Sequence, residues 1–255
     1  MQQRMLQKFP KGIYLLPSLI TTLALFCGFY ALIAVFNGFY YKAAVAIIIA
    51  AMFDFMDGKV ARLTNSTSRF GMEYDSLSDL MSFGIAPGLL VYSWVLQPYG
   101  RIGWMAAFLY VICGALRLAR YNTVQGDDDY TGNKFIGLPI PAAAIVIASL
   151  VILANDLLLM EKLHPMILVI TVYTLAFLMV SNVRYASPKQ FEFKKRRPFE
   201  ILVVMVLLVY IVAVIPELMV FLVAVGYVLS GPVLWIAYKR HSKKEEAAKS
   251  QKLRP

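Results

Sequence analysis

Two apolar stretches, residues 40–56 and 72–96, meet in a segment rich in acidic residues. Residues 54–79 read DFMDGKVARLTNSTSRFGMEYDSLSD, and the four aspartates are Asp54, Asp57, Asp75 and Asp79. One pair lies in the last turns of the first stretch, and the other pair lies in the first turns of the second. Charged side chains are costly within a membrane segment, so these aspartates indicate a functional site.

The composition excludes an ordinary soluble domain. Of the 255 residues, 60% are hydrophobic and 16% are charged. Soluble domains are about 45–50% apolar and about 25% charged, and disordered chains are less apolar still. The net charge of +10 suggests nucleic-acid binding at first. In so apolar a chain, basic loops on one side of a bilayer explain the charge better, and we expect no nucleic-acid partner.

Eight segments approach the length of about 20 apolar residues that a membrane helix needs. They are residues 13–36, 40–56, 72–96, 102–120, 138–158, 165–183, 199–215 and 217–238. If the N-terminus is inside and each helix crosses once, 22 of the 25 Lys and Arg residues fall inside. The sequence therefore predicts an all-α polytopic integral membrane helix bundle with eight spans and both termini cytoplasmic.

Helix geometry predicts that two acidic faces oppose each other. At 100° per residue, Asp54, Asp57, Gly58 and Ala61 fall within one arc, while Gly71, Asp75, Ser78, Asp79 and Ser82 share one face of the next helix. The polar turn between the helices offers hydroxyl groups for an N-cap. Carboxylates about 5 Å apart repel each other by a few kcal/mol. Either some are protonated or cations lie between them, and oxygen ligands favour Mg²⁺, Mn²⁺ or Ca²⁺.

Small residues accompany the aspartates on both faces. Gly58, Ala61 and Gly71 leave room for a flat ligand or a phosphate group. Small residues also allow membrane helices to pack closely. The spacing alone leaves both interpretations open.

The segment from Asp54 to Asp79 resembles the signature of the CDP-alcohol phosphotransferase family, with every fixed position present at the expected spacing. Other segments are similar to the membrane-embedded bacterial and archaeal phosphatidylserine synthases of that family. They are LPSLITTLALFCG (16–28), DSLSDLMSFGIAP (75–87), GALRLARYN (114–122), FIGLPIPAAA (135–144) and LMVSNVRY (178–185). The resemblance covers about residues 14–190, and Ser18 departs from the asparagine expected in the first segment.

The resemblance implies a six-helix core, a homodimer and an active site open to the cytoplasm. Asp54, Asp57 and Asp75 would hold two divalent ions, Mg²⁺ or Mn²⁺, and Asp79 would complete the second site and act as the general base. Gly58, Ala61 and Gly71 would line the cytidine and ribose site, and Arg62 would contact the nucleotide phosphates. The implied reaction joins CDP-diacylglycerol and L-serine to give phosphatidylserine and CMP.

The sequence says less about how the acceptor is bound than about the metal and nucleotide sites. Arg117 and Arg120 are expected to hold a carboxylate or a phosphate, or else to anchor the helix at the headgroups. Ser78 and Ser82 are expected to line the acceptor pocket, or else to pack between helices. Alternative functions are a related enzyme that uses glycerol phosphate or inositol phosphate, and a cation-coupled transporter.

The predicted organisation has four parts. Residues 1–12 form a cytoplasmic segment, 13–190 the catalytic core, 191–238 a C-terminal helix pair, and 239–255 a basic cytoplasmic tail. We expect the protein in the cytoplasmic membrane.

Overall fold

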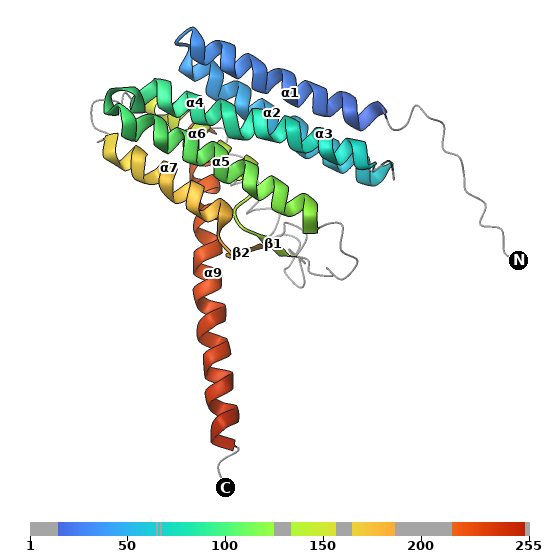
Figure 1. Ribbon diagram of the computed structural model, residues 1–255, viewed down its shortest axis with the longest axis vertical. Helices are drawn as coiled ribbons and strands as arrows, with labels where there is room; N and C mark the ends of the chain where they lie inside the picture. Colours follow the sequence, from blue (N-terminus) through green and yellow to red (C-terminus); the bar gives the residue numbers. More distant parts are fainter. Residues whose placement is uncertain are drawn as a thin grey trace, which may run out of the picture.

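The computed structural model describes residues 15–64, 66, 68–124, 134–156, 165–186 and 216–252. The described chain is a helix bundle with one small sheet (Figure 1). The main helices are α1 (Leu15–Phe36), α2 (Tyr40–Leu63), α3 (Arg69–Asp79), α4 (Ala86–Val91), α5 (Arg101–Val124), α6 (Ile140–Asp156), α7 (Pro165–Val180) and α9 (Pro216–Lys252). Figure 1 shows α9 crossing the other helices, with its C-terminal half extending beyond them.

The predicted third span is a single helical rod of changing pitch. Two π-helical segments, η1 (Leu80–Ile85) and η2 (Tyr92–Leu96), flank α4, and the 3₁₀ turn η3 (Gln97–Tyr99) follows. Gly100 has a φ of 54°, which ends the rod before α5 begins. Sequence periodicity predicts the extent of the rod but not the π-helical turns.

Several helices are long and apolar enough to cross a bilayer. By length and hydropathy the described candidates are Pro17–Phe36, Arg69–Thr123 and Pro216–Trp235, with shorter apolar helices at Ile140–Asn155 and Met166–Val180. Large apolar side chains also face outward, including Phe26 (66% exposed) and Phe108 (58% exposed). The chain is therefore an integral membrane protein. The predicted span 199–215 lies outside the described residues, and the number of spans stays a prediction.

Alanines pack α1 against α2. Ala31, Ala34, Ala43 and Ala50 are each 3% exposed or less. Side chains this small let two helices approach closely, which is a common means of packing within membranes. Gly38, with a φ of 75°, makes the tight turn between them. The two helices consequently lie antiparallel.

Hydroxyl groups cap both helix ends at the α2–α3 turn. The Thr64 hydroxyl donates to the Val60 carbonyl (2.7 Å) at the end of α2. The Ser68 hydroxyl accepts a hydrogen bond from the Gly71 amide (3.0 Å) at the start of α3. The expected N-cap is therefore present, and it fixes where the helix that carries Asp75 and Asp79 begins.

The prediction of an all-α chain misses one small sheet. Strand β1 (Lys134–Ile136) pairs antiparallel with β2 (Arg184–Ala186), with Phe135 opposite Tyr185. The partners are about 50 residues apart in sequence, and each strand has only three residues. A pairing this short and this distant leaves no readable alternation in the sequence.

Tyr185 links this sheet to α9. Its hydroxyl donates to the Val228 carbonyl (3.2 Å), and its ring lies 5.6 Å from that of Tyr227. Pro232 has no N–H, so the carbonyl four residues earlier, that of Val228, lacks its helical donor. A Cβ on Gly231 would collide with the Tyr185 ring. Burial raises the pKa of Tyr185 to about 12, so the hydroxyl stays protonated and able to donate.

The expected C-terminal tail is in part helical. Helix α9 continues past the predicted end of the last span, residue 238, as far as Lys252. Lys, Glu, Ala and Gln dominate this extension, and all favour helices.

We predict that Tyr185→Phe lowers the free energy of unfolding by about 1 kcal/mol, because the Val228 carbonyl loses the hydrogen bond from the Tyr185 hydroxyl. Thermal unfolding in detergent measures the loss. Pro232→Ala restores a backbone N–H to that carbonyl, so Tyr185→Phe should cost less in that background. Equal costs in both backgrounds would contradict the assigned role.

Candidate active site

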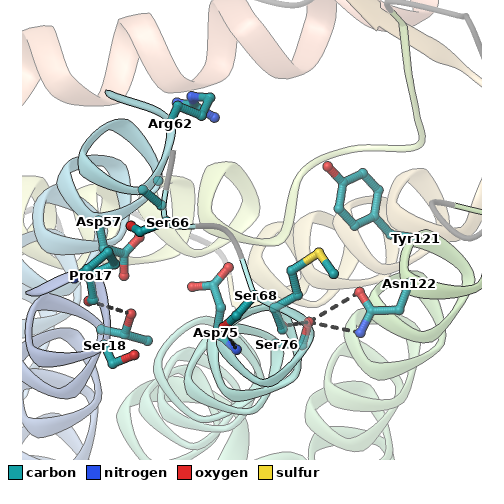
Figure 2. Close-up of a pocket in the computed structure, with 15 residues that line it drawn as sticks. Pro17, Ser18, Asp57, Arg62, Ser66, Ser68, Asp75, Ser76, Tyr121 and Asn122 are labelled. Carbon is teal, nitrogen blue, oxygen red and sulfur yellow. Dashed lines mark hydrogen bonds between the residues drawn. The ribbon is translucent and has the colours of Figure 1, made fainter. Parts of the chain in front are cut away.

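Three carboxyl groups converge where the end of α2 faces the start of α3. One oxygen from each of Asp54, Asp57 and Asp75 lies within 4.8 Å of the other two. Figure 2 shows Asp57 and Asp75 on opposite sides of one cavity. The two acidic faces therefore oppose each other, as the helix geometry predicts.

Asp57 is the most deeply buried of the three. It is 5% exposed, and its Oδ2 atom has no hydrogen-bond partner. The Thr21 hydroxyl of α1 lies within hydrogen-bonding reach of the Asp57 carboxyl and also of the Pro17 carbonyl (3.0 Å). A buried carboxylate oxygen without a partner is costly, so this atom favours a bound cation or a proton.

These residues fit a divalent metal ion. Hard cations such as Mg²⁺ and Mn²⁺ prefer carboxylate oxygens, and three carboxylates converge on one point. The unsatisfied Asp57 oxygen would gain a partner if a cation were bound there. The donor set contains no thiol and no imidazole, which makes a zinc site less suitable.

Asp79 extends the acidic cluster towards a buried arginine. Its carboxyl group lies within hydrogen-bonding reach of that of Asp54, and such a contact forms only when one of the two carries the proton. The positive charge of Arg117, on α5, attracts both carboxylates. Arg117 is only 8% exposed, and its Nε atom has no hydrogen-bond partner. This burial favours a binding role for Arg117 over the anchoring alternative, and its role stays a prediction.

A cavity of about 310 Å³ opens beside the aspartates. The start of α1, the end of α2, the start of α3 and the end of α5 enclose it (Figure 2). Its lining residues are Pro17, Ser18, Thr21, Asp57, Gly58, Ala61, Arg62, Ser66, Ser68, Gly71, Met72, Asp75, Ser76, Tyr121 and Asn122. The four residues expected at a nucleotide site, Gly58, Ala61, Arg62 and Gly71, are all among them.

The space at Gly58 is not used for helix packing. A Cβ placed there would meet only the Arg62 guanidinium of its own helix, at 3.9 Å. At Gly71 a Cβ would lie 3.1 Å from the Ser68 hydroxyl that caps α3. Gly58 therefore leaves room for a ligand, whereas Gly71 also makes room for the helix cap.

Sequence reasoning expected α5 to contribute Arg117 and Arg120, but it did not single out Tyr121 and Asn122, which line the cavity. The Asn122 amide donates to the Ser76 hydroxyl (3.1 Å) and to the Glu73 carboxylate (3.2 Å), which ties α5 to α3. Tyr121 precedes it and also lines the cavity. The sequence signal that could have found Tyr121 and Asn122 is their position. Both lie in the last turn of a helix, at the same end of the bundle as the aspartates.

Ser78 and Ser82 face α1 and not the cavity. The Ser78 hydroxyl donates to the Thr21 carbonyl (3.3 Å), and the Ser82 hydroxyl donates to the Ala24 carbonyl (3.2 Å). Neither serine lines the cavity. Both are almost fully buried, at 3% and 0% exposed. For both serines this arrangement therefore favours the packing alternative over the expected role in the acceptor pocket.

Arg120 contacts the end of α7. Its guanidinium donates to the Val180 carbonyl (3.2 Å), the Asn182 side chain (3.4 Å) and the Ser181 carbonyl (3.5 Å). Carbonyls at a helix end lack helical donors, and a nearby cation also interacts favourably with the helix dipole. Arg120 thus stabilises the junction between α7 and the sheet, whereas Arg117, one turn earlier on α5, faces Asp79 and Asp54.

The chain belongs to the CDP-alcohol phosphatidyltransferase family, which matches residues 14–177. That match ends before α9, so α9 lies outside the part of the chain that defines the family.

Named relatives agree with this membership. A Helicobacter pylori (strain ATCC 700392 / 26695) protein called CDP-diacylglycerol–serine O-phosphatidyltransferase is 36% identical over 225 residues, covering 88% of this chain and 92% of the relative. A Bacillus subtilis protein of the same name is 36% identical, covering 69% of this chain and 92% of the relative. An archaetidylserine synthase from Methanothermobacter thermautotrophicus is 39% identical, covering 52% and 56% respectively.

We predict that Asp57→Asn weakens Mn²⁺ binding by about tenfold or more, because metal affinity already falls tenfold to 100-fold when an outer-shell group is lost. Electron paramagnetic resonance of the purified protein titrated with Mn²⁺ measures the affinity. Glu73→Gln removes a carboxylate near the cavity but outside the cluster, and should leave the affinity unchanged. Equal weakening by both variants would argue for a diffuse electrostatic effect.

Proposed function

We propose that this protein transfers the phosphatidyl group from CDP-diacylglycerol to the hydroxyl of L-serine, giving phosphatidylserine and CMP. The observation that carries the proposal is the convergence of Asp54, Asp57 and Asp75 beside a cavity that Gly58, Ala61, Arg62 and Gly71 of the family signature line. The relatives from Helicobacter, Bacillus and Methanothermobacter all have serine in their names and differ in the lipid. Serine is therefore the better supported part of the substrate pair.

Two divalent ions, Mg²⁺ or Mn²⁺, complete the proposed site. Asp54, Asp57 and Asp75 would hold them, with Asp79 as a further ligand. Bound metal would supply positive charge to the diphosphate oxygens and so stabilise the charge that develops as the phosphorus–oxygen bond breaks.

The cavity residues would bind and orient the nucleotide. Gly58, Ala61 and Gly71 leave one wall without large side chains, where the sugar and base fit. Arg62, at the exposed rim, would contact the phosphates (Figure 2). Holding the donor in one pose lowers the entropic cost of the reaction.

In the proposed reaction, the serine hydroxyl oxygen forms a bond to the phosphorus that carries diacylglycerol. The bond from that phosphorus to the CMP oxygen breaks, and CMP leaves with its electron pair. Asp79 would take the proton of the hydroxyl, since a neutral hydroxyl is a poor nucleophile. Arg117, buried with Nε unpaired, would hold the serine carboxylate or a donor phosphate.

The proposed topology has eight spans, both termini in the cytoplasm and the site at the cytoplasmic face of the cytoplasmic membrane. Basic residues surround the acidic end of the bundle, including Lys59, Arg62 and Arg69, as the positive-inside rule requires. The lipid donor has its headgroup at that interface, where water-soluble serine and CMP also reach it. A homodimer is proposed on the family resemblance alone.

Product identification tests the function. Purified protein with CDP-diacylglycerol, Mg²⁺ or Mn²⁺ and labelled L-serine should give labelled phosphatidylserine and one CMP per product. Glycerol 3-phosphate in place of serine should release no CMP above the rate without acceptor. CMP release with glycerol 3-phosphate but not with serine would place the protein in another branch of the family.

A second experiment tests the general base. Asp79→Asn should lower kcat by about 100-fold or more, because general bases contribute about 10²–10⁴ in rate. Binding of CDP-diacylglycerol, measured by isothermal titration, should persist because Asp79 does not line the cavity. If Asp79→Asn keeps its turnover, another group takes the proton.

A further inference from the structure

A second cavity lies between α1 and α2, away from the aspartates. Its volume is about 260 Å³, and its lining residues are Phe26, Cys27, Tyr30, Tyr41, Lys42, Val45, Ala46 and Ile49. We call this cavity the α1–α2 groove. Lys42 precedes Asp54 by twelve residues of the same helix, which places the two about 18 Å apart along the axis. The groove is therefore separate from the active site.

The shape of the groove follows from the spacing of its residues. Phe26 and Tyr30 are four apart on α1, and Tyr41, Val45 and Ile49 are four apart on α2. Residues at this spacing form rows along a helix, so the walls run parallel to the helix axes. An extended hydrocarbon chain in a bilayer has this same direction. The walls are apolar apart from two tyrosine hydroxyls and one lysine.

The charge of Lys42 lies at one end of the groove. Its Nζ atom is 4.6 Å from the centre of the Phe39 ring, and no acidic side chain of the described residues pairs with it. In the predicted topology Lys42 is one of only three basic residues on the outer side. Tyr30 and Tyr41 stand nearby, and tyrosines prefer the depth of the lipid headgroups. A cation at that depth attracts a negatively charged headgroup.

We propose that the α1–α2 groove binds an anionic phospholipid of the bilayer, with one acyl chain along the groove and the phosphate against Lys42. The apolar walls accept the chain, and the lysine distinguishes an anionic lipid from a zwitterionic one. This site is independent of the proposed function, because its residues are distinct from those of the catalytic cavity.

Native mass spectrometry of the full-length protein tests the proposal. The protein is incubated in detergent with equal amounts of phosphatidylglycerol and phosphatidylcholine, and the retained lipids are counted. A single basic residue at the surface favours an anionic lipid by about fivefold, so phosphatidylglycerol should be enriched by about that factor. Equal retention of the two lipids would overturn the proposal.

Two charge variants locate the site. Lys42→Gln should lower the enrichment by about fivefold relative to the unchanged protein, because the other basic residues remain. Arg101→Gln should keep the enrichment, since Arg101 does not line the groove. Arg101 is a matched control because it lies at the same end of the bundle as Lys42. Lys42 is near the start of α2, and the Tyr40 hydroxyl at that start donates to the Ser93 carbonyl (3.0 Å). Ser93 belongs to the rod that ends just before Arg101 begins α5. Enrichment that is unchanged by Lys42→Gln would overturn the assignment.

A third variant tests the apolar wall. Val45→Phe fills the groove from its partly exposed side and should reduce retention of both lipids at least twofold. Its thermal unfolding should match that of the unchanged protein, because Val45 lies at the edge of the core. Unchanged retention in a folded Val45→Phe protein would show that the acyl chain does not occupy the groove.

Discussion

Repulsion among buried carboxylates constrains this whole end of the molecule. Like charges about 5 Å apart repel by about 3 kcal/mol at an effective dielectric constant of 20. Asp54, Asp57 and Asp75 lie within this distance of one another, and the Asp79 carboxyl lies within hydrogen-bonding reach of Asp54. Such a cluster persists only where cations or protons offset the repulsion. The fold must therefore both hold the acidic faces together and admit positive charge between them.

Helix α1 holds the acidic face of the third span in place. Ser78 and Ser82 donate to carbonyls of α1, one turn apart, and a Cβ on Gly28 would collide with Ser82. These contacts fix the rotation of α3 about its axis. Asp75 and Asp79 lie on the same continuous helical rod as the two serines. The rotation of that rod therefore decides whether the carboxylates point at α2. The serines thus serve the site without lining it.

Local geometry explains what the sequence could predict. The opposition of the acidic faces depends on 100° spacing and a short capped turn, both of which are readable within 26 residues. The family signature lies in the same segment. Ser78 and Ser82 were assigned to the pocket because they share the face of Asp75, but which neighbour covers part of a face depends on the fold. The contacts of Arg120 and the β1–β2 pairing join segments about 50 to 60 residues apart, beyond the reach of periodicity.

Arg117 offsets part of the negative charge of the acidic cluster. Gly103, Tyr110 and Arg117 repeat every seven residues along α5, so they share one face. A Cβ on Gly103 would collide with the Leu96 carbonyl, and the Tyr110 hydroxyl donates to the Phe83 carbonyl (3.0 Å). The same face that packs α5 on the rod therefore brings the arginine to Asp54 and Asp79. Because burying that cation is costly without a partner, Asp54 and Asp79 stabilise Arg117, and the arginine in turn offsets part of the repulsion within the cluster whose other carboxyl groups converge on the metal position.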